Sequence, residues 1–136
     1  MKKRQILLAS ILVTIFAIIF GIITCGGYFN WVYKLEPVNV WKPMTGTPQP
    51  IFFVAEFFLS MLFVIVYALF SKGIPGKNKY IKGLVYGLAV FSVGMLQGVF
   101  STYFFMTVNH VVLIYWTIWG LIAIPAKGII TAAVYE

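Results

Sequence analysis

Long apolar runs alternate with short polar stretches along this chain, and their lengths predict its fold. Two runs of about twenty residues are followed by one of about fifty, which polar residues at 107–110 interrupt. A helix needs about 20 residues to cross the hydrocarbon of a bilayer. The pattern therefore predicts an all-α, polytopic four-helix membrane bundle in a single domain, 1–136. The expected helices are 5–27, 51–71, 82–105 and 110–132.

Composition supports the membrane assignment. Of the 136 residues, 62% are hydrophobic and 10% are charged, whereas a soluble domain carries about 25% charged residues. So few charges could not cover a water-exposed surface. The composition excludes an ordinary water-soluble enzyme or binding domain.

The net charge of +7 is concentrated in two places, Lys2–Arg4 and the loop 72–81. Basic residues next to transmembrane helices mark the cytoplasmic side. We therefore expect both termini and this loop in the cytoplasm, the loop 28–50 outside, and a multi-pass protein of the inner (plasma) membrane. Topology and attraction to the lipid bilayer account for the charge, so nucleic acid is not an expected partner.

Small and polar residues recur at helical spacing on every predicted helix. In the third helix they form two GxxxG pairs, Gly83–Gly87 and Gly94–Gly98. Small residues let helix backbones approach closely in lipid, and polar residues face inward. The glycine face then either packs inside the bundle or forms a homodimer through the third helix.

Glu56 is the one carboxylate inside a predicted span, and ionisable groups at membrane depth are functional candidates. Ser60 and Tyr67 follow it on one helix face. At ~1.5 Å per residue, Glu56 lies about 9 Å below the outer end of its helix. Gln97 is expected at a similar level, with His110 slightly above. Desolvation disfavours a charged carboxylate, so Glu56 could donate a hydrogen bond to Gln97.

Other chemistry has little support. A single cysteine, Cys25, and a single histidine allow neither a disulfide nor a metal cluster, and no motif of a catalytic site occurs. No cofactor, metal site or enzymatic activity is therefore expected. Haem would need Met95, Met106 or a second subunit opposite His110. Lys127 is expected to extend toward the inner interface.

Two resemblances bear on function. The start of the third helix, Lys82-Gly83-Leu84-Val85-Tyr86-Gly87, and the loop residues Trp31, Trp41 and Pro43 resemble those of small uncharacterised four-helix membrane proteins of bacteria and archaea. That resemblance implies no assigned activity. The layout also resembles the small multidrug resistance transporters, four-helix dimers with an essential membrane glutamate. In that family the glutamate lies in the first helix, whereas Glu56 lies in the second.

Three functions follow as hypotheses. The first is a non-enzymatic subunit or accessory of a larger membrane complex, in which Glu56 only joins helices. The second is a small proton- or cation-coupled transporter that uses Glu56. The third is a haem- or quinone-binding membrane protein.

Overall fold

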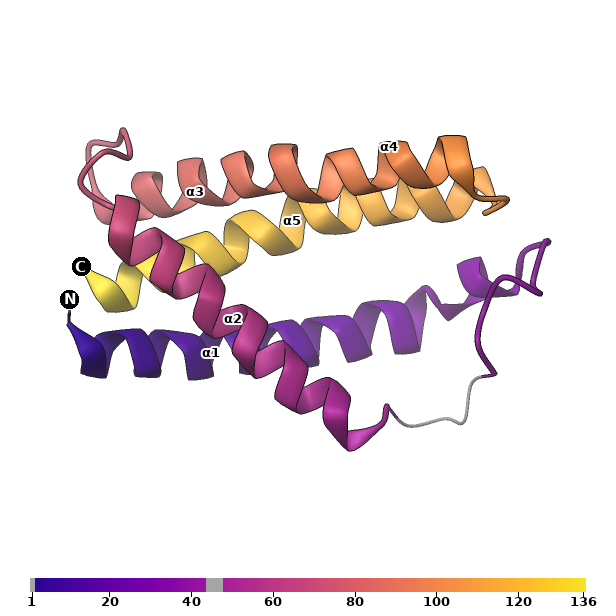
Figure 1. Cartoon of the computed structure of the whole chain (residues 1–136), viewed down its shortest axis with the longest axis horizontal. Coiled ribbons are helices and arrows are strands. Elements are labelled where there is room, and N and C mark those ends of the chain that lie inside the picture. Colours follow the sequence, from indigo (N-terminus) through magenta and orange to yellow (C-terminus); the bar gives the residue numbers. More distant parts are fainter. Residues whose placement is uncertain (1, 44–47) are drawn as a thin grey trace.

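The computed structural model describes residues 2–43 and 48–136, and every regular element in that part of the chain is helical. Four helices are long and apolar enough to cross a membrane, which confirms the all-helical fold (Figure 1). Two of them contain π-helical segments, Ile22–Tyr28 after α1 and Phe91–Met95 between α3 and α4. The α-helices are α1 (Lys3–Gly21), α2 (Pro50–Phe70), α3 (Lys79–Val90), α4 (Leu96–Phe105) and α5 (His110–Tyr135).

The helix starts follow from local chemistry. Pro50 occupies the first turn of α2, where its missing N–H is not needed. Asn78 and Asn109 cap α3 and α5, because their side-chain oxygens accept backbone N–H bonds from Ile81 and Val111, both at 2.9 Å. The Asn78 cap places the start of α3 at Lys79, three residues before the position expected from hydropathy.

The helices pack around α5, and α2 crosses the others obliquely (Figure 1). The continuous rod of α3 and α4 runs along one side of α5, and α1 lies on its other side. Both chain termini lie at one end of the bundle, here called the terminal end. The opposite end, formed by residues 29–43 and 106–109, is called the loop end.

The two GxxxG pairs of the third span have different surroundings. A Cβ added to Gly83 would overlap the backbone oxygen of Gly128, and one added to Gly87 would overlap the Cα of Pro125. Gly94 and Gly98 are exposed, with no atom within 4 Å of an added Cβ. The expected single glycine face is therefore wrong, because the first pair is buried inside the bundle and only the second is on the surface.

Hydroxyl groups on the helices bond mainly within their own helix. Ser10, Thr14, Thr117 and Thr131 each donate to the carbonyl four residues earlier, at 2.7–2.8 Å. This pairing satisfies the hydroxyl without a neighbouring helix. These side chains are therefore compatible with close helix packing and form no hydrogen bond to another described helix through these hydroxyl donors.

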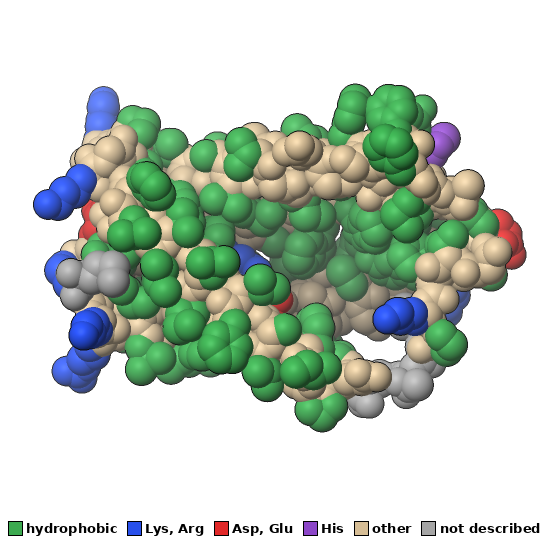
Figure 2. All heavy atoms as spheres, viewed as in Figure 1, with side chains coloured by type: hydrophobic (Ala, Val, Ile, Leu, Met, Phe, Trp, Pro, Cys, Tyr) green, Lys and Arg blue, Asp and Glu red, His purple; other side chains and the backbone are tan. Residues whose placement is uncertain are grey.

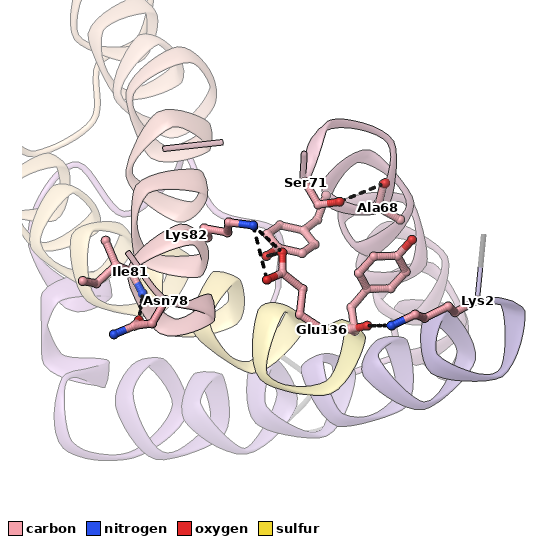
Figure 3. Close-up of polar contacts among 9 residues, drawn as sticks. Lys2, Ala68, Ser71, Asn78, Ile81, Lys82 and Glu136 are labelled. Carbon is pink, nitrogen blue, oxygen red and sulfur yellow. Dashed lines mark hydrogen bonds and ion pairs between the residues drawn. The ribbon is translucent and has the colours of Figure 1, made fainter. Parts of the chain in front are cut away.

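At the terminal end, polar groups join α2, α3 and α5 (Figure 3). Glu136 forms an ion pair with Lys82 at 3.4 Å and accepts a hydrogen bond from the Tyr67 hydroxyl at 2.9 Å. Lys2 donates to the backbone oxygen of Tyr135 at 3.4 Å, which brings the start of α1 to the same place. Tyr67 therefore belongs to this cluster and lies far from Glu56 along α2.

Candidate functional site

An ion pair joins α2 to α5 inside the bundle. The Lys127 Nζ donates to Glu56 Oε1 at 3.0 Å, and each side chain keeps 18% of its surface exposed. The prediction that Lys127 extends to the inner interface is wrong. In the hydrocarbon, a lysine and a carboxylate that can reach each other each lower the cost of burying the other's charge.

The ion pair lies deeper than the position of Glu56 in its helix suggested. Lys127 is about 26 Å along α5 from His110, and the whole helix is about 39 Å long. Because Glu56 contacts Lys127, it lies nearer the middle of the bundle than its place in α2 suggested. The expected depth is wrong because it assumed that all helices start at one level. The first residues of α2 in fact lie well short of the loop end (Figure 1).

The ion pair forms part of the wall of a cavity of about 840 Å³, here called the chamber. It lies between α1, α2, α5 and the loop-end residues. Figure 2 shows the molecule hollowed on this face, with a basic and an acidic side chain at the border of the hollow. The chamber is lined by Ala17, Ile18, Gly21, Ile22, Cys25, Gly26, Tyr33, Lys42, Pro43, Pro48, Phe52, Glu56, Trp119 and Lys127.

One wall of the chamber is the π-helical segment Ile22–Tyr28, a helix type that often occurs at functional sites. Within it, the Cys25 Sγ lies 3.3 Å from the Tyr115 hydroxyl. Just before Cys25, Thr24 accepts a hydrogen bond from Trp119 Nε1 at 2.8 Å. Because Tyr115 and Trp119 belong to α5, these contacts hold the π-helical segment against that helix.

Aromatic side chains hold the loop end against α5. Trp116 Nε1 donates to the Tyr33 hydroxyl at 2.9 Å, and Trp41 packs edge-on against both rings. Burial raises the pKa of Tyr33 to about 12, so its hydroxyl is neutral at physiological pH. Asn109 also donates to the Glu36 backbone oxygen at 2.8 Å. This aromatic clasp (Tyr33, Trp41, Trp116) places Tyr33 and Lys42 at the loop side of the chamber.

The structure separates the residues expected to gather around Glu56. Gln97 is exposed on α4, so the expected hydrogen bond to Glu56 is replaced by the bond to Lys127. His110 is exposed at the loop end and packs against the ring of Tyr103, with centroids 5.4 Å apart. Ser60 is buried, one turn from Glu56, and its hydroxyl has no partner among the described residues.

Three charged groups line the chamber. The chamber presents one carboxylate and two ammonium groups, from Glu56, Lys127 and Lys42, on otherwise largely apolar walls. Residues 2–43 and 48–136 contain no group of three His, Cys, Asp or Glu side chains that could hold a metal ion.

Lys127 and Trp119 were not among the expected site residues. A signal for Lys127 was present, since it is the single lysine well inside the last apolar run and Glu56 is the single carboxylate inside a span. Opposite charges at membrane depth tend to pair. No family model, curated protein or solved structure matches this chain.

Proposed function

We propose that this protein is a non-enzymatic membrane protein that binds a small amphipathic molecule in the chamber. The observation that carries the proposal is the Glu56–Lys127 ion pair on the wall of a cavity of about 840 Å³. Small-molecule sites are typically apolar cavities of about 300–1,000 Å³ with a few placed polar groups. The chamber has this size and this distribution of polar groups.

A purely structural ion pair fits the geometry less well. Such a pair would be sealed between helices and would use its remaining hydrogen-bonding groups on protein partners. Here a single N–O contact joins the two side chains, and both line the cavity. The remaining Lys127 donors and the second Glu56 oxygen are therefore placed to meet a ligand.

The other hypotheses gain less support from the site. A carboxylate that exchanges protons or cations needs a free position beside it for the exchanged ion. In this structure the Lys127 ammonium already contacts Glu56. Met95 packs against Gly120, about 15 Å along α5 from His110. That separation disfavours a haem held by His110 and Met95, while a quinone would be one amphipathic ligand of suitable size.

The proposal also covers the orientation of the bundle in the membrane. We place the terminal end in the cytoplasm and the loop end outside the plasma (inner) membrane. The basic residues Lys2–Arg4 and the segment 72–81, with Lys72 and Lys77, support this orientation. Figure 2 shows the blue side chains gathered mainly at the terminal end.

The test uses Cys25, the single cysteine, as a reporter inside the chamber. Protein in dodecyl maltoside is treated with methyl methanethiosulfonate, and modification is followed by intact mass. A mixture of dodecylamine, dodecyl phosphate and lauroyl lysophosphatidylethanolamine is then added. We expect this mixture to slow the modification, because a bound amphiphile covers the thiol.

Two matched glycine variants locate the effect. Gly21 lines the chamber and Gly94 lies on the surface, and neither has an atom within 4 Å of an added Cβ. Gly21→Trp should occupy the part of the chamber beside Gly21 and reduce the protection, whereas Gly94→Trp should keep it. An absence of protection in the parent protein, or equal protection in Gly21→Trp, would contradict the proposal.

A second candidate is membership of a membrane assembly, favoured by the exposed Gly94–Gly98 face. Glycines four apart let a second helix approach closely in lipid, and the occupant proposed is α4 of a second copy. Gly94→Ile and Gly98→Ile should then lower the dimer fraction that chemical crosslinking detects in membranes. An unchanged dimer fraction, or the absence of dimers in the parent protein, would exclude this candidate.

A further inference from the structure

We propose that the ligand of the chamber carries a zwitterionic head, with an ammonium group that binds Glu56 and an anionic group that binds Lys127. The shared chemistry is that of an aminoalkyl phosphate or an amino acid, attached to an apolar body or free. This inference rests on the proposed function and specifies the ligand class for the same site.

The ion pair must keep both of its charges paired before and after a ligand binds. The Lys127 Nζ and Glu56 Oε1 lie 3.0 Å apart near the middle of the bundle. A ligand with one charge would pair with one side chain and leave the other charge without a partner, which is strongly unfavourable away from water. A head with both charges gives Glu56 and Lys127 each a new partner of opposite charge, so neither charge is left unpaired.

The chamber lining carries more positive than negative groups. Lys42 lies on the loop side of the chamber and adds a second cation to Lys127, against the single carboxylate of Glu56. An anionic group with several acceptor oxygens can bond to more than one ammonium group, as phosphate does. The excess of cationic over anionic groups in the lining therefore favours an anionic group such as phosphate in the head.

Apolar side chains of the chamber provide a surface for the apolar part of the ligand. The chamber lining includes apolar residues, among them Ile18 and Ile22 of the first span and Phe52 of α2. The face around the hollow is covered largely by hydrophobic side chains (Figure 2). A molecule with a charged head and an alkyl chain can therefore enter from the lipid side, head toward Glu56 and chain toward this face.

The experiment tests the three amphiphiles one at a time. All three carry a twelve-carbon chain, as does the detergent dodecyl maltoside. Cys25 modification is measured with dodecylamine, dodecyl phosphate and lauroyl lysophosphatidylethanolamine singly. We expect the zwitterion to protect at a concentration about ten-fold or more below that of either single-charge compound, a difference of about 1.4 kcal/mol. Glycerophosphoethanolamine, the same head without the chain, shows whether the source is a lipid or a free zwitterion. Protection by the chain-bearing compound alone assigns a lipid, and equal protection assigns the free molecule.

Variants of the ion pair should change which of the three compounds protects Cys25 best. In Glu56→Gln the unpaired Lys127 should make dodecyl phosphate the best ligand, and in Lys127→Gln dodecylamine should become the best. Glu56→Gln/Lys127→Gln strands no charge, so it should fold even if the single variants do not, and it should lose the preference for the zwitterion. Glu136→Gln alters the ion pair with Lys82, which lies outside the chamber. This variant should keep the preference for the zwitterion.

The outcomes distinguish the two proposals. If no amphiphile protects Cys25, both the proposed function and this inference fail. If the three compounds protect equally, or if the double variant still prefers the zwitterion, the chamber binds amphiphiles but the inference about the head is wrong.

Discussion

Lys127 of α5 reaches Glu56 of α2 with a single 3.0 Å N–O contact, and this contact ties the obliquely crossing helix to the rest of the bundle. Removing one partner of a fully buried ion pair costs about 3–5 kcal/mol, and removing both can be neutral. Both side chains are 18% exposed here, so a value at or below the lower end of that range is expected.

The first prediction follows as a double-mutant cycle. Glu56→Gln and Lys127→Gln should each lower the free energy of unfolding by about 2–3 kcal/mol. The double variant should recover most of that loss, because no charge is left stranded. Titration with SDS, followed by circular dichroism, measures the change. Additive losses in the double variant would mean that the two side chains do not interact in the folded protein.

A second prediction concerns the contact of α3 with α5. Gly128→Ala places a methyl group against the backbone of Gly83, where no flexible side chain can move aside. Overpacking of this kind costs about 1–3 kcal/mol. Gly98→Ala, in open space on α4, should change stability by less than about 0.5 kcal/mol. Equal effects of the two substitutions in the same SDS titration would show that the α3–α5 contact is not as close as described.

The main helices of the fold could be predicted from the sequence. The level of individual side chains along the bundle could be predicted less well. The lengths of the apolar runs predict four helices, because a helix that crosses the bilayer needs an apolar run of a definite length. The level of Glu56 could not be counted from Pro50, since α2 begins deeper than α5 and crosses it at an angle. Lys127 was assigned to the interface because a long side chain can extend either way along its helix, and only tertiary packing decides which.

A third prediction addresses the aromatic clasp. Tyr33→Phe removes the acceptor of the Trp116 Nε1 bond and leaves that half-buried donor without this partner, at a cost near the lower end of the range of about 1–3 kcal/mol for a fully buried donor. The change should also shift tryptophan fluorescence to longer wavelength as the loop end loosens. An unaltered spectrum and stability would show that the clasp does not hold the loop.

The same tyrosine gives a fourth prediction, for alkaline pH. Burial raises the Tyr33 pKa from its ordinary 10 to about 12 in the folded protein. The unfolded chain therefore releases this proton first, so the stability contributed by the neutral hydroxyl is complete below pH 10 and is lost as pH rises toward 12. Tyr33→Phe should flatten the decline of stability between these pH values. An identical slope in the parent and the variant would contradict the assignment.

A fifth prediction tests orientation. Fusion of green fluorescent protein after Glu136 should fluoresce, and alkaline phosphatase at the same position should be inactive, if the terminal end is cytoplasmic. Reporters inserted after Val38, at the loop end, should show the opposite pattern. The reverse result at both positions would invert the proposed topology.

The central claim is that the chamber beside Glu56 and Lys127 holds one amphipathic ligand, and native mass spectrometry counts that ligand directly. With lauroyl lysophosphatidylethanolamine as the probe, the account predicts one saturable molecule per chain in the parent protein and in Gly94→Trp. It predicts weaker binding of this molecule in Gly21→Trp, where the indole takes up part of the chamber. Unsaturable binding in the parent protein, or equally strong binding in Gly21→Trp, would contradict it.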